Sequence, residues 1–162
     1  MILAHCRLDG RSGHDTGREL LARLYRQATE EDLPPIALTD RGKPYFENSS
    51  WHFSISHTPK HVFCILAEEN VAIDAEETDR NINLKLAYRI LSPAERERFE
   101  AAEDQSAALL KLWVLKECAA KLSGEGLRGF PNKTDFSPDD PRVQTVDGCF
   151  VAIMTEESET TR

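Results

Sequence analysis

Three carboxylates of this chain lie where regular secondary structure would present them in groups. In "VAIDAEE" (71–77), alternate residues of a strand face the same side, so Asp74 and Glu76 share a face. In "LWVLKECAAK" (112–121), residues four apart on a helix form a stripe that carries Glu117 and Lys121. Three oxygen ligands suit a hard divalent cation such as Mg²⁺, whereas structural zinc prefers Cys and His. The spacing therefore predicts a cation site between a strand and a helix.

Each half of this pattern also has a simpler interpretation. Two carboxylates spaced by one residue are typical of a solvated strand face, and Glu117 with Lys121 could form an exposed ion pair on the helix surface. Trp113, on the same stripe, is interpreted as an apolar anchor that orients the helix. Lys116 lies off the stripe and is equally compatible with a solvated charge.

Two segments upstream add groups that can approach a polyphosphate. "RGKPYF" (41–46) offers Lys43, and "FSISHT" (53–58) offers Ser56 and His57 near the end of an alternating strand. The sequence contains neither a Walker loop nor a G-x-G-x-x-G loop. Phosphate binding would therefore rest on side chains and a metal ion.

The composition indicates one soluble globular domain. The 162 residues are 30% charged and 40% hydrophobic, with a formal net charge of −8, which argues against general nucleic-acid binding. An acidic ligand would have to meet a local basic patch. Four scattered cysteines fit buried free thiols, and we expect neither a signal peptide nor a membrane span, hence a cytoplasmic protein.

Periodicity predicts strands and helices in blocks. A helix over 16–27 would be capped by Asp15 or Thr16, and the acidic turn at 68–70 would join two strands as a hairpin. Ser92 with Pro93 should start a helix, and Gly124 should end the longest one. Strands are expected at 1–8, 51–58, 61–69, 70–77 and 149–157, and helices at 16–27, 83–92, 92–102 and 105–124.

The ordered set "GKPYF", "FSISHT", "VAIDAEE" and "LWVLKECAAKLSGEGL" resembles the 4′-phosphopantetheinyl transferases, in particular the monomeric surfactin-synthetase type. The resemblance covers roughly residues 40–127. It implies an enzyme that moves the phosphopantetheine arm of coenzyme A to a serine of an apo carrier protein, acyl or peptidyl, and releases 3′,5′-ADP.

The resemblance also assigns roles to residues. Asp74, Glu76 and Glu117 would hold Mg²⁺, for which Mn²⁺ could substitute. Glu117 would be the catalytic base, directly or through a water on the metal, and Lys121 would stabilise charge on the phosphates. Coenzyme A contacts are implied for Lys43, Ser56, His57 and Lys121. The basic residue for the 3′-phosphate stays open between Arg7, Arg11 and Arg18.

A carrier-protein docking site is implied for residues 84–99, where basic residues outnumber acidic ones. Lys85 and Arg89 would steer the carrier, while Leu86 and Ile90 would supply burial or would instead belong to the core.

The implied fold is α+β with two similar halves around a pseudo-twofold axis, each a short antiparallel sheet with a helix packed on it. The active site would lie between the halves. We expect a single domain over 1–155, with halves 1–70 and 71–155, and a flexible tail over 156–162. Two alternatives are an idle module that binds coenzyme A or a carrier protein, and another Mg²⁺-dependent phosphoryl enzyme. Coenzyme A and the carrier are the expected partners, with no nucleic acid and no membrane.

Overall fold

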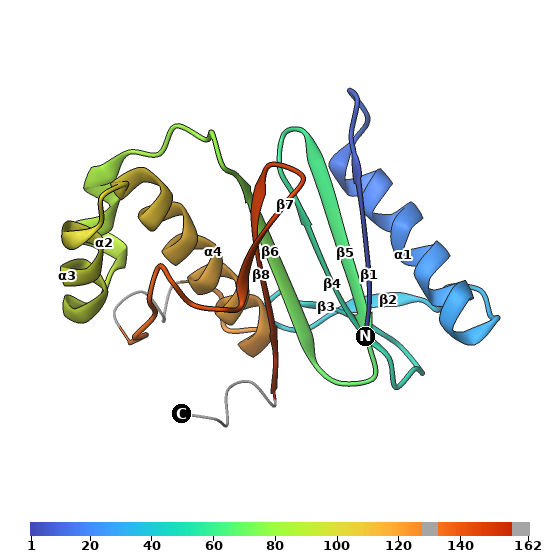
Figure 1. Ribbon diagram of the computed structural model, residues 1–162. Coiled ribbons are helices and arrows are strands. Elements are labelled where there is room, and N and C mark those ends of the chain that lie inside the picture. The colour runs from blue at the N-terminus through green and yellow to red at the C-terminus, as the bar shows by residue number, and fades with distance from the viewer. Residues whose placement is uncertain (128–132, 157–162) are drawn as a thin grey trace.

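The computed structural model describes residues 1–127 and 133–156, and within them the strands form three antiparallel sheets (Figure 1). Their orders are β1-β5-β4, β2-β3 and β6-β8-β7. The α+β class predicted from the sequence is confirmed. The strands are β1 (Ile2–Arg7), β2 (Ile36–Leu38), β3 (Pro44–Phe46), β4 (His52–His57), β5 (His61–Ala67), β6 (Val71–Glu77), β7 (Val143–Val146) and β8 (Cys149–Thr155).

Helix α1 (Gly13–Thr29) covers one face of the β1-β5-β4 sheet. The helix starts three residues earlier than predicted. The Ser12 hydroxyl, rather than Asp15 or Thr16, is its cap and accepts a hydrogen bond from the Asp15 N–H at 3.2 Å. Gly17 lets the helix lie close to β4, because a Cβ there would be 2.8 Å from the Ile55 side chain.

The predicted hairpin at residues 68–70 is wrong. β5 pairs with β1 and β4, whereas β6 pairs with β8, which comes from the far end of the chain. The acidic turn therefore carries the chain from one sheet to another. Local turn chemistry cannot distinguish this crossing from a hairpin, because the pairing partner of β6 is set by apolar residues more than seventy positions away.

Helix α4 (Gln105–Ser123) covers the β6-β8-β7 sheet and, with α3 (Pro93–Ala101), encloses the largest apolar cluster. Ser92 caps α3 through a capping box, as predicted, and Gly124 ends α4 at φ +71°. The helix predicted over 83–92 is instead a 3-10 turn, η1 (Leu84–Leu86), followed by a single turn, α2 (Ala87–Ile90). The chain is extended at Ser92 because Pro93 disfavours a helical residue before it.

Two serines join the first and third sheets where β4 faces β6. The Ser54 hydroxyl accepts a hydrogen bond from the Ile73 N–H, and the Ser56 hydroxyl accepts one from the Ala75 N–H, both at 3.1 Å. Apolar residues of β5, β6 and β8 pack beside this contact and form a separate small core. The two sheets are therefore held together by both side-chain hydrogen bonds and burial.

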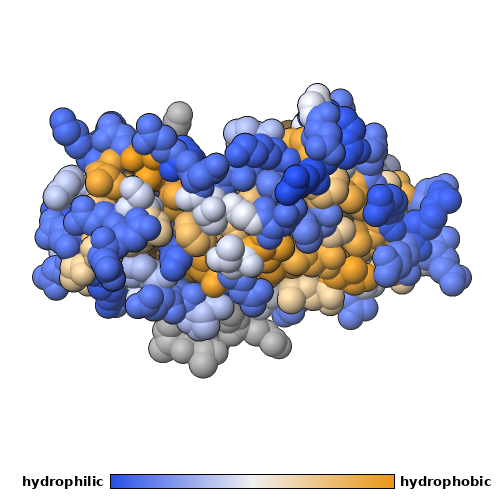
Figure 2. Space-filling model, turned by 45° about the horizontal axis from the view of Figure 1, so that its top comes forward, coloured by the Kyte–Doolittle hydropathy of each residue, from blue (hydrophilic) through white to orange (hydrophobic). Residues whose placement is uncertain are grey.

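The surface is largely polar, although hydrophobic side chains are exposed between hydrophilic ones on both lobes (Figure 2). Cys64, Cys118 and Cys149 are buried, Cys6 is half-buried, and all four are free thiols as predicted. Among the described residues, every helix is too short or too polar to span a bilayer.

Candidate active site

Helix α4 presents its charges to two different environments. Lys116 is buried on one side, where its ammonium lies 2.7 Å from Glu95 Oε2 and donates a hydrogen bond to Thr134 at 2.5 Å. It is not a solvated charge. Glu117 and Lys121 share the other side and line a cavity. The three charges in the middle of this apolar helix are thus either paired in the core or turned toward a cavity.

Lys121 meets Asp74 across the junction of helix and sheet. The Lys121 Nζ lies 2.7 Å from Asp74 Oδ1 and also donates to the backbone carbonyls of Ile73 and Ile55, at 3.1 and 3.4 Å. The Ser56 hydroxyl donates to the same Asp74 oxygen at 3.2 Å. Asp74 is 6% exposed, so these contacts compensate a buried carboxylate and fix Lys121 at the joint of β4 and β6.

Glu76 lies on the same face of β6 as Asp74, as the strand alternation predicted. It is half-buried, forms an ion pair with Arg80 and accepts a hydrogen bond from the Trp113 side chain. Trp113 is therefore more than an apolar anchor, since its polar group orients a site carboxylate. Arg80 follows β6 by three residues and was not anticipated from the sequence.

The three carboxylates resist ionisation. Burial, the negative charge of Asp74 and that of Glu76 raise the pKa of Glu117 to about 7, although Lys121 opposes the shift. Burial also raises the pKa of Asp74 against Lys121, and that of Glu76 against Arg80. Burial combined with mutual repulsion is the electrostatic state of a site built for positive charge.

The donor set fits a hard divalent cation, because it consists of carboxylate oxygens that repel one another in the absence of positive charge. The three side chains are not gathered as a ready cage, since their oxygens are not all within 4.8 Å of one another. Asp74 is instead turned to Lys121 and Glu76 to Arg80. These two cations hold the carboxylates that a divalent ion would use.

A cavity of about 460 Å³ opens beside Glu117 and Lys121. Although the whole chain is acidic, four of the residues that line it carry a full positive charge, and two are histidines. This is the local basic patch that an acidic ligand requires. The basic lining consists of His14, Arg18, Arg41, Lys43, His57 and Lys121.

Besides Lys121, two of the predicted phosphate contacts reach this cavity. His57 is exposed at the end of β4 and lies against Gly13, where a Cβ would be 2.7 Å from the imidazole ring. Lys43 also lines the cavity, but its ammonium donates to Asn70 and to the Leu122 carbonyl, both at 2.8 Å. Burial lowers the pKa of Lys43.

Ser56 occupies a different place from the one expected. Its side chain is 5% exposed, and its hydroxyl bridges Asp74 and the Ala75 N–H. This position suits a residue that orients Asp74, and a direct contact with coenzyme A stays a prediction.

Of the three arginines left open by the sequence, Arg18 is the one that lines the cavity. Arg11 donates to the Leu8 and Arg7 carbonyls, and Arg7 lies 3.6 Å from Asp147 elsewhere on the molecule. His14 and Arg41 were missed. Arg41 lies two residues before Lys43, and this proximity in sequence could have predicted its position. Nothing in the sequence near His14 predicts its position, because only the packing of α1 on β4 brings it to the site.

The fold and this site define a class of protein. The chain belongs to the 4′-phosphopantetheinyl transferase superfamily, whose sequence profile matches residues 70–158. This confirms the resemblance found in the motifs.

Among the curated relatives, 4′-phosphopantetheinyl transferase Sfp of Bacillus subtilis (strain 168) is 31% identical over 113 residues, which cover 68% of this chain and 49% of Sfp. The transferase psf-1 of Bacillus pumilus is 36% identical over 113 residues, or 68% and 47% of the two chains. The transferase gsp of Aneurinibacillus migulanus is 32% identical over 88 residues, or 53% and 36%. The chain spans about half the length of the curated relatives it matches.

Proposed function

We propose that this chain transfers the 4′-phosphopantetheine arm of coenzyme A to a serine of an apo acyl or peptidyl carrier protein and releases 3′,5′-ADP. The observation that carries the proposal is the placement of Glu117, with a pKa near 7, beside Lys121 in a cavity with a basic lining. The names of the relatives support the same reaction.

Glu117 is the proposed general base. Burial and the neighbouring carboxylates raise the pKa of Glu117 in the chain without metal, and a carboxylate of raised pKa is a better acceptor for the proton of a serine hydroxyl. As the serine oxygen bonds to the phosphorus of the pantetheine phosphate, its proton passes to Glu117 and the bond to the 3′,5′-ADP oxygen breaks. Lys121 is held by Asp74 close to Glu117 and stabilises negative charge that develops on the phosphates.

Asp74, Glu76 and Glu117 are the residues that would hold Mg²⁺ or Mn²⁺. Such an ion, when bound, neutralises diphosphate charge and orients the substrate. When no ion is bound, Lys121 compensates the charge of Asp74 and Arg80 that of Glu76.

The basic lining of the cavity supplies the proposed contacts with coenzyme A. We assign Lys43 and His57 to the diphosphate, as the resemblance implies, and Arg18 to the 3′-phosphate; the support is that all three line the cavity. Ser56 acts through Asp74. Binding at Lys43 would exchange its bonds to Asn70 and the Leu122 carbonyl for a phosphate.

The cavity lining supports an active site between two halves. Its residues come from α1, the β3 segment and β4 on one side and from α4 on the other. We take 1–70 and 71–155 as halves of one domain related by a pseudo-twofold axis, in line with a three-stranded sheet and a covering helix in each. Of the predicted tail, residues 157–162 lie outside the described part of the chain.

Intact-mass spectrometry tests the reaction. Apo acyl carrier protein is incubated with the full chain, coenzyme A and Mg²⁺, with and without EDTA. We expect a mass gain of one phosphopantetheine that EDTA abolishes. No gain on several acyl and peptidyl carriers, despite measurable coenzyme A binding, would contradict the proposal and favour an idle binding module. Release of 3′,5′-ADP without any carrier would indicate a different phosphoryl enzyme.

The η1–α2 segment is the proposed carrier-docking surface. Lys85 and Arg89 are exposed, while Leu86 and Ile90 are only partly buried against the core. These two apolar residues can therefore contact both the core and a docked carrier. Tyr88 is 55% exposed and lies under the Arg96 guanidinium. Figure 2 shows hydrophobic side chains between hydrophilic ones on the lobe that carries α2 and α3. An acidic carrier would find charge for steering and an apolar centre for burial.

Reversing the charges of this surface should impair the carrier and spare coenzyme A. For Lys85→Glu with Arg89→Glu, we expect the KM for the carrier to rise by about tenfold at low salt, because steering is lost. Steady-state kinetics with either substrate varied would measure it. Arg23→Glu with Arg26→Glu, an equal charge change on exposed positions of α1, is the control. Equal carrier KM values for both double variants would place the docking site elsewhere.

A further inference from the structure

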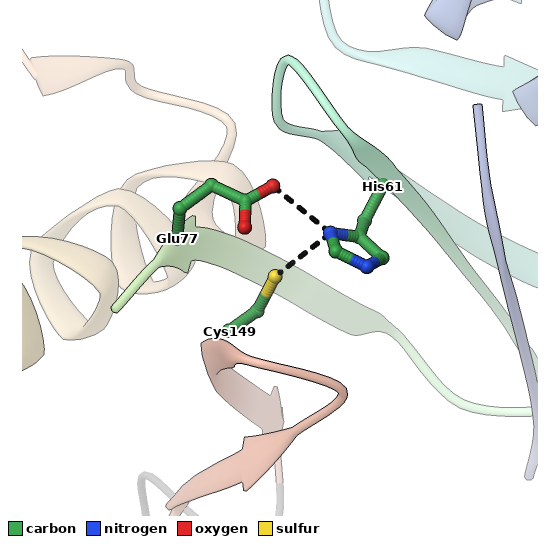
Figure 3. Close-up of side chains that lie close together, drawn as sticks. All are labelled: His61, Glu77 and Cys149. Atoms are coloured by element: carbon green, nitrogen blue, oxygen red, sulfur yellow. Dashed lines mark hydrogen bonds and ion pairs between the residues drawn. The ribbon is translucent and has the colours of Figure 1, made fainter. Parts of the chain in front are cut away.

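A second cluster of chemically active side chains lies where three strands meet, and the proposed transfer reaction does not use it. His61 begins β5, Glu77 ends β6 and Cys149 begins β8, and the three side chains point toward one another (Figure 3). They are 5%, 7% and 0% exposed. Three polar groups of different chemistry are thus buried together at the joint of the first and third sheets.

Their distances are those of a shared centre. His61 Nδ1 lies 2.9 Å from Glu77 Oε1 and 3.5 Å from Cys149 Sγ. In the described part of the chain, this is the group of three whose potential ligand atoms all lie within 4.8 Å of one another. Imidazole nitrogen, thiolate sulfur and carboxylate oxygen are the donors that Zn²⁺ accepts, whereas Mg²⁺ prefers oxygen alone.

The groups around these three side chains match those that orient metal ligands. The Thr58 hydroxyl donates to Glu77 Oε1 at 2.5 Å. His61 Nε2 is buried and makes no well-aligned hydrogen bond, although Asp147 Oδ2 is 3.2 Å away. Histidine ligands usually donate their second ring N–H to a carboxylate, and ligating carboxylates are themselves hydrogen-bonded. Asp147 and Thr58 are placed to fill these two roles.

The cluster can be reached from solvent without passing through the active site. His61, Glu77 and Asp147 line a cavity of about 540 Å³ that also includes Arg7 and Lys60 and shares no lining residue with the active-site cavity. An ion could enter here, and the cavity could provide water as a further ligand.

We propose that His61, Glu77 and Cys149 form a zinc-binding site, oriented by Asp147 and Thr58, that clamps β5 to β6 and β8 and leaves the fourth position to water. Binding replaces the thiol proton of Cys149 with the ion and releases that proton to solvent, while the imidazole proton shifts from Nδ1 to Nε2, where the N–H donates a hydrogen bond to Asp147. Burial and the charge of Glu77 raise the pKa of that thiol to about 12, so zinc binding must remove a proton that the thiol otherwise keeps at neutral pH.

Metal titration of the full chain tests the site directly. Zn²⁺ is titrated by calorimetry in saturating Mg²⁺, which occupies the Asp74–Glu76–Glu117 site, and Co²⁺ is added to a parallel sample for absorption spectroscopy. We expect one equivalent of Zn²⁺ and a thiolate-to-cobalt charge-transfer band. Cys149→Ala should lose the band. It should also bind Zn²⁺ at least about a hundredfold more weakly, which exceeds the usual loss of affinity when a residue that only hydrogen-bonds to a metal ligand is changed.

Cys64→Ala is the matched control, because it removes another fully buried thiol, on the same strand as His61. It should keep the band and the affinity. His61→Gln should behave like Cys149→Ala, and Zn²⁺ should raise the Tm of the wild type but of neither variant. A wild type without the band, or Cys149→Ala within threefold of wild-type affinity, would overturn the proposal. Absence of the band from the wild type overturns the proposal even if a variant fails to fold.

Discussion

Glu117→Gln is expected to lower kcat for transfer to the carrier by about a thousandfold. Glutamine keeps the shape of the side chain but cannot take a proton at neutral pH, and general bases contribute roughly 10²–10⁴ to such rates. It also removes one of the three carboxylates proposed to hold the cation. Mass spectrometry of the carrier over a time course measures the loss. Substantial transfer by a folded Glu117→Gln protein would refute the assignment of Glu117.

The same substitution should stabilise the protein in EDTA, which separates a lost function from a lost fold. The pKa of Glu117 is about 7 in the folded chain and near 4.5 in the unfolded chain, so protonated Glu117 stabilises the folded chain relative to ionised Glu117. This contribution to stability is complete below about pH 4.5. That contribution disappears as the pH rises through 7. Relative to wild type, Glu117→Gln should therefore gain on the order of 2 kcal/mol of unfolding free energy between pH 4.5 and 8.

Urea unfolding at several pH values would show this gain. Glu97→Gln, which neutralises an exposed carboxylate on α3, is the control and should follow the wild type across the range. A pH-independent difference between Glu117→Gln and wild type would mean that folding does not raise the pKa of Glu117.

Lys121→Met should lower kcat by about 10²–10³, the usual effect of removing one group that stabilises transition-state charge. It should also reduce stability, because Asp74 would remain buried without its cation. Loss of one partner of a buried pair costs about 3–5 kcal/mol, and the partial exposure of Lys121 lowers our expectation to about 2 kcal/mol. Kinetics and urea unfolding measure the two effects.

The double variant Lys121→Met with Asp74→Asn separates these effects. Without a buried charge to compensate, it should recover most of the stability lost in Lys121→Met, while transfer stays low. Recovery of both stability and transfer would contradict the roles proposed for Lys121 and for Asp74.

The sequence predicted those parts of the fold that depend on neighbouring residues. Ser92 with Pro93 and Gly124 marked helix ends, because capping is decided within one turn. The residues around Glu68 were misread as a hairpin turn, since the partner of β6 lies at the other end of the chain. The short β2–β3 pair was also missed, because its three-residue strands are too brief for a periodic pattern.

The same division holds for the site. Strand alternation and helix spacing placed Asp74, Glu76, Glu117 and Lys121 near one another. They could not predict that Arg18 would line the cavity from α1, nor that the Ser56 hydroxyl would donate a hydrogen bond to Asp74. Both depend on how elements distant in sequence pack together.

The two serines between β4 and β6 also bear on self-association. Unpaired strand edges are templates on which a second molecule can add its own strand. β4 and β6 are edge strands of their sheets, and the hydroxyls of Ser54 and Ser56 occupy backbone N–H groups of β6 that such a strand would seek. Within these two sheets, the outward edges are β1 and β7, the latter only four residues long. Intermolecular β-pairing is thereby directed away from the contact between β4 and β6.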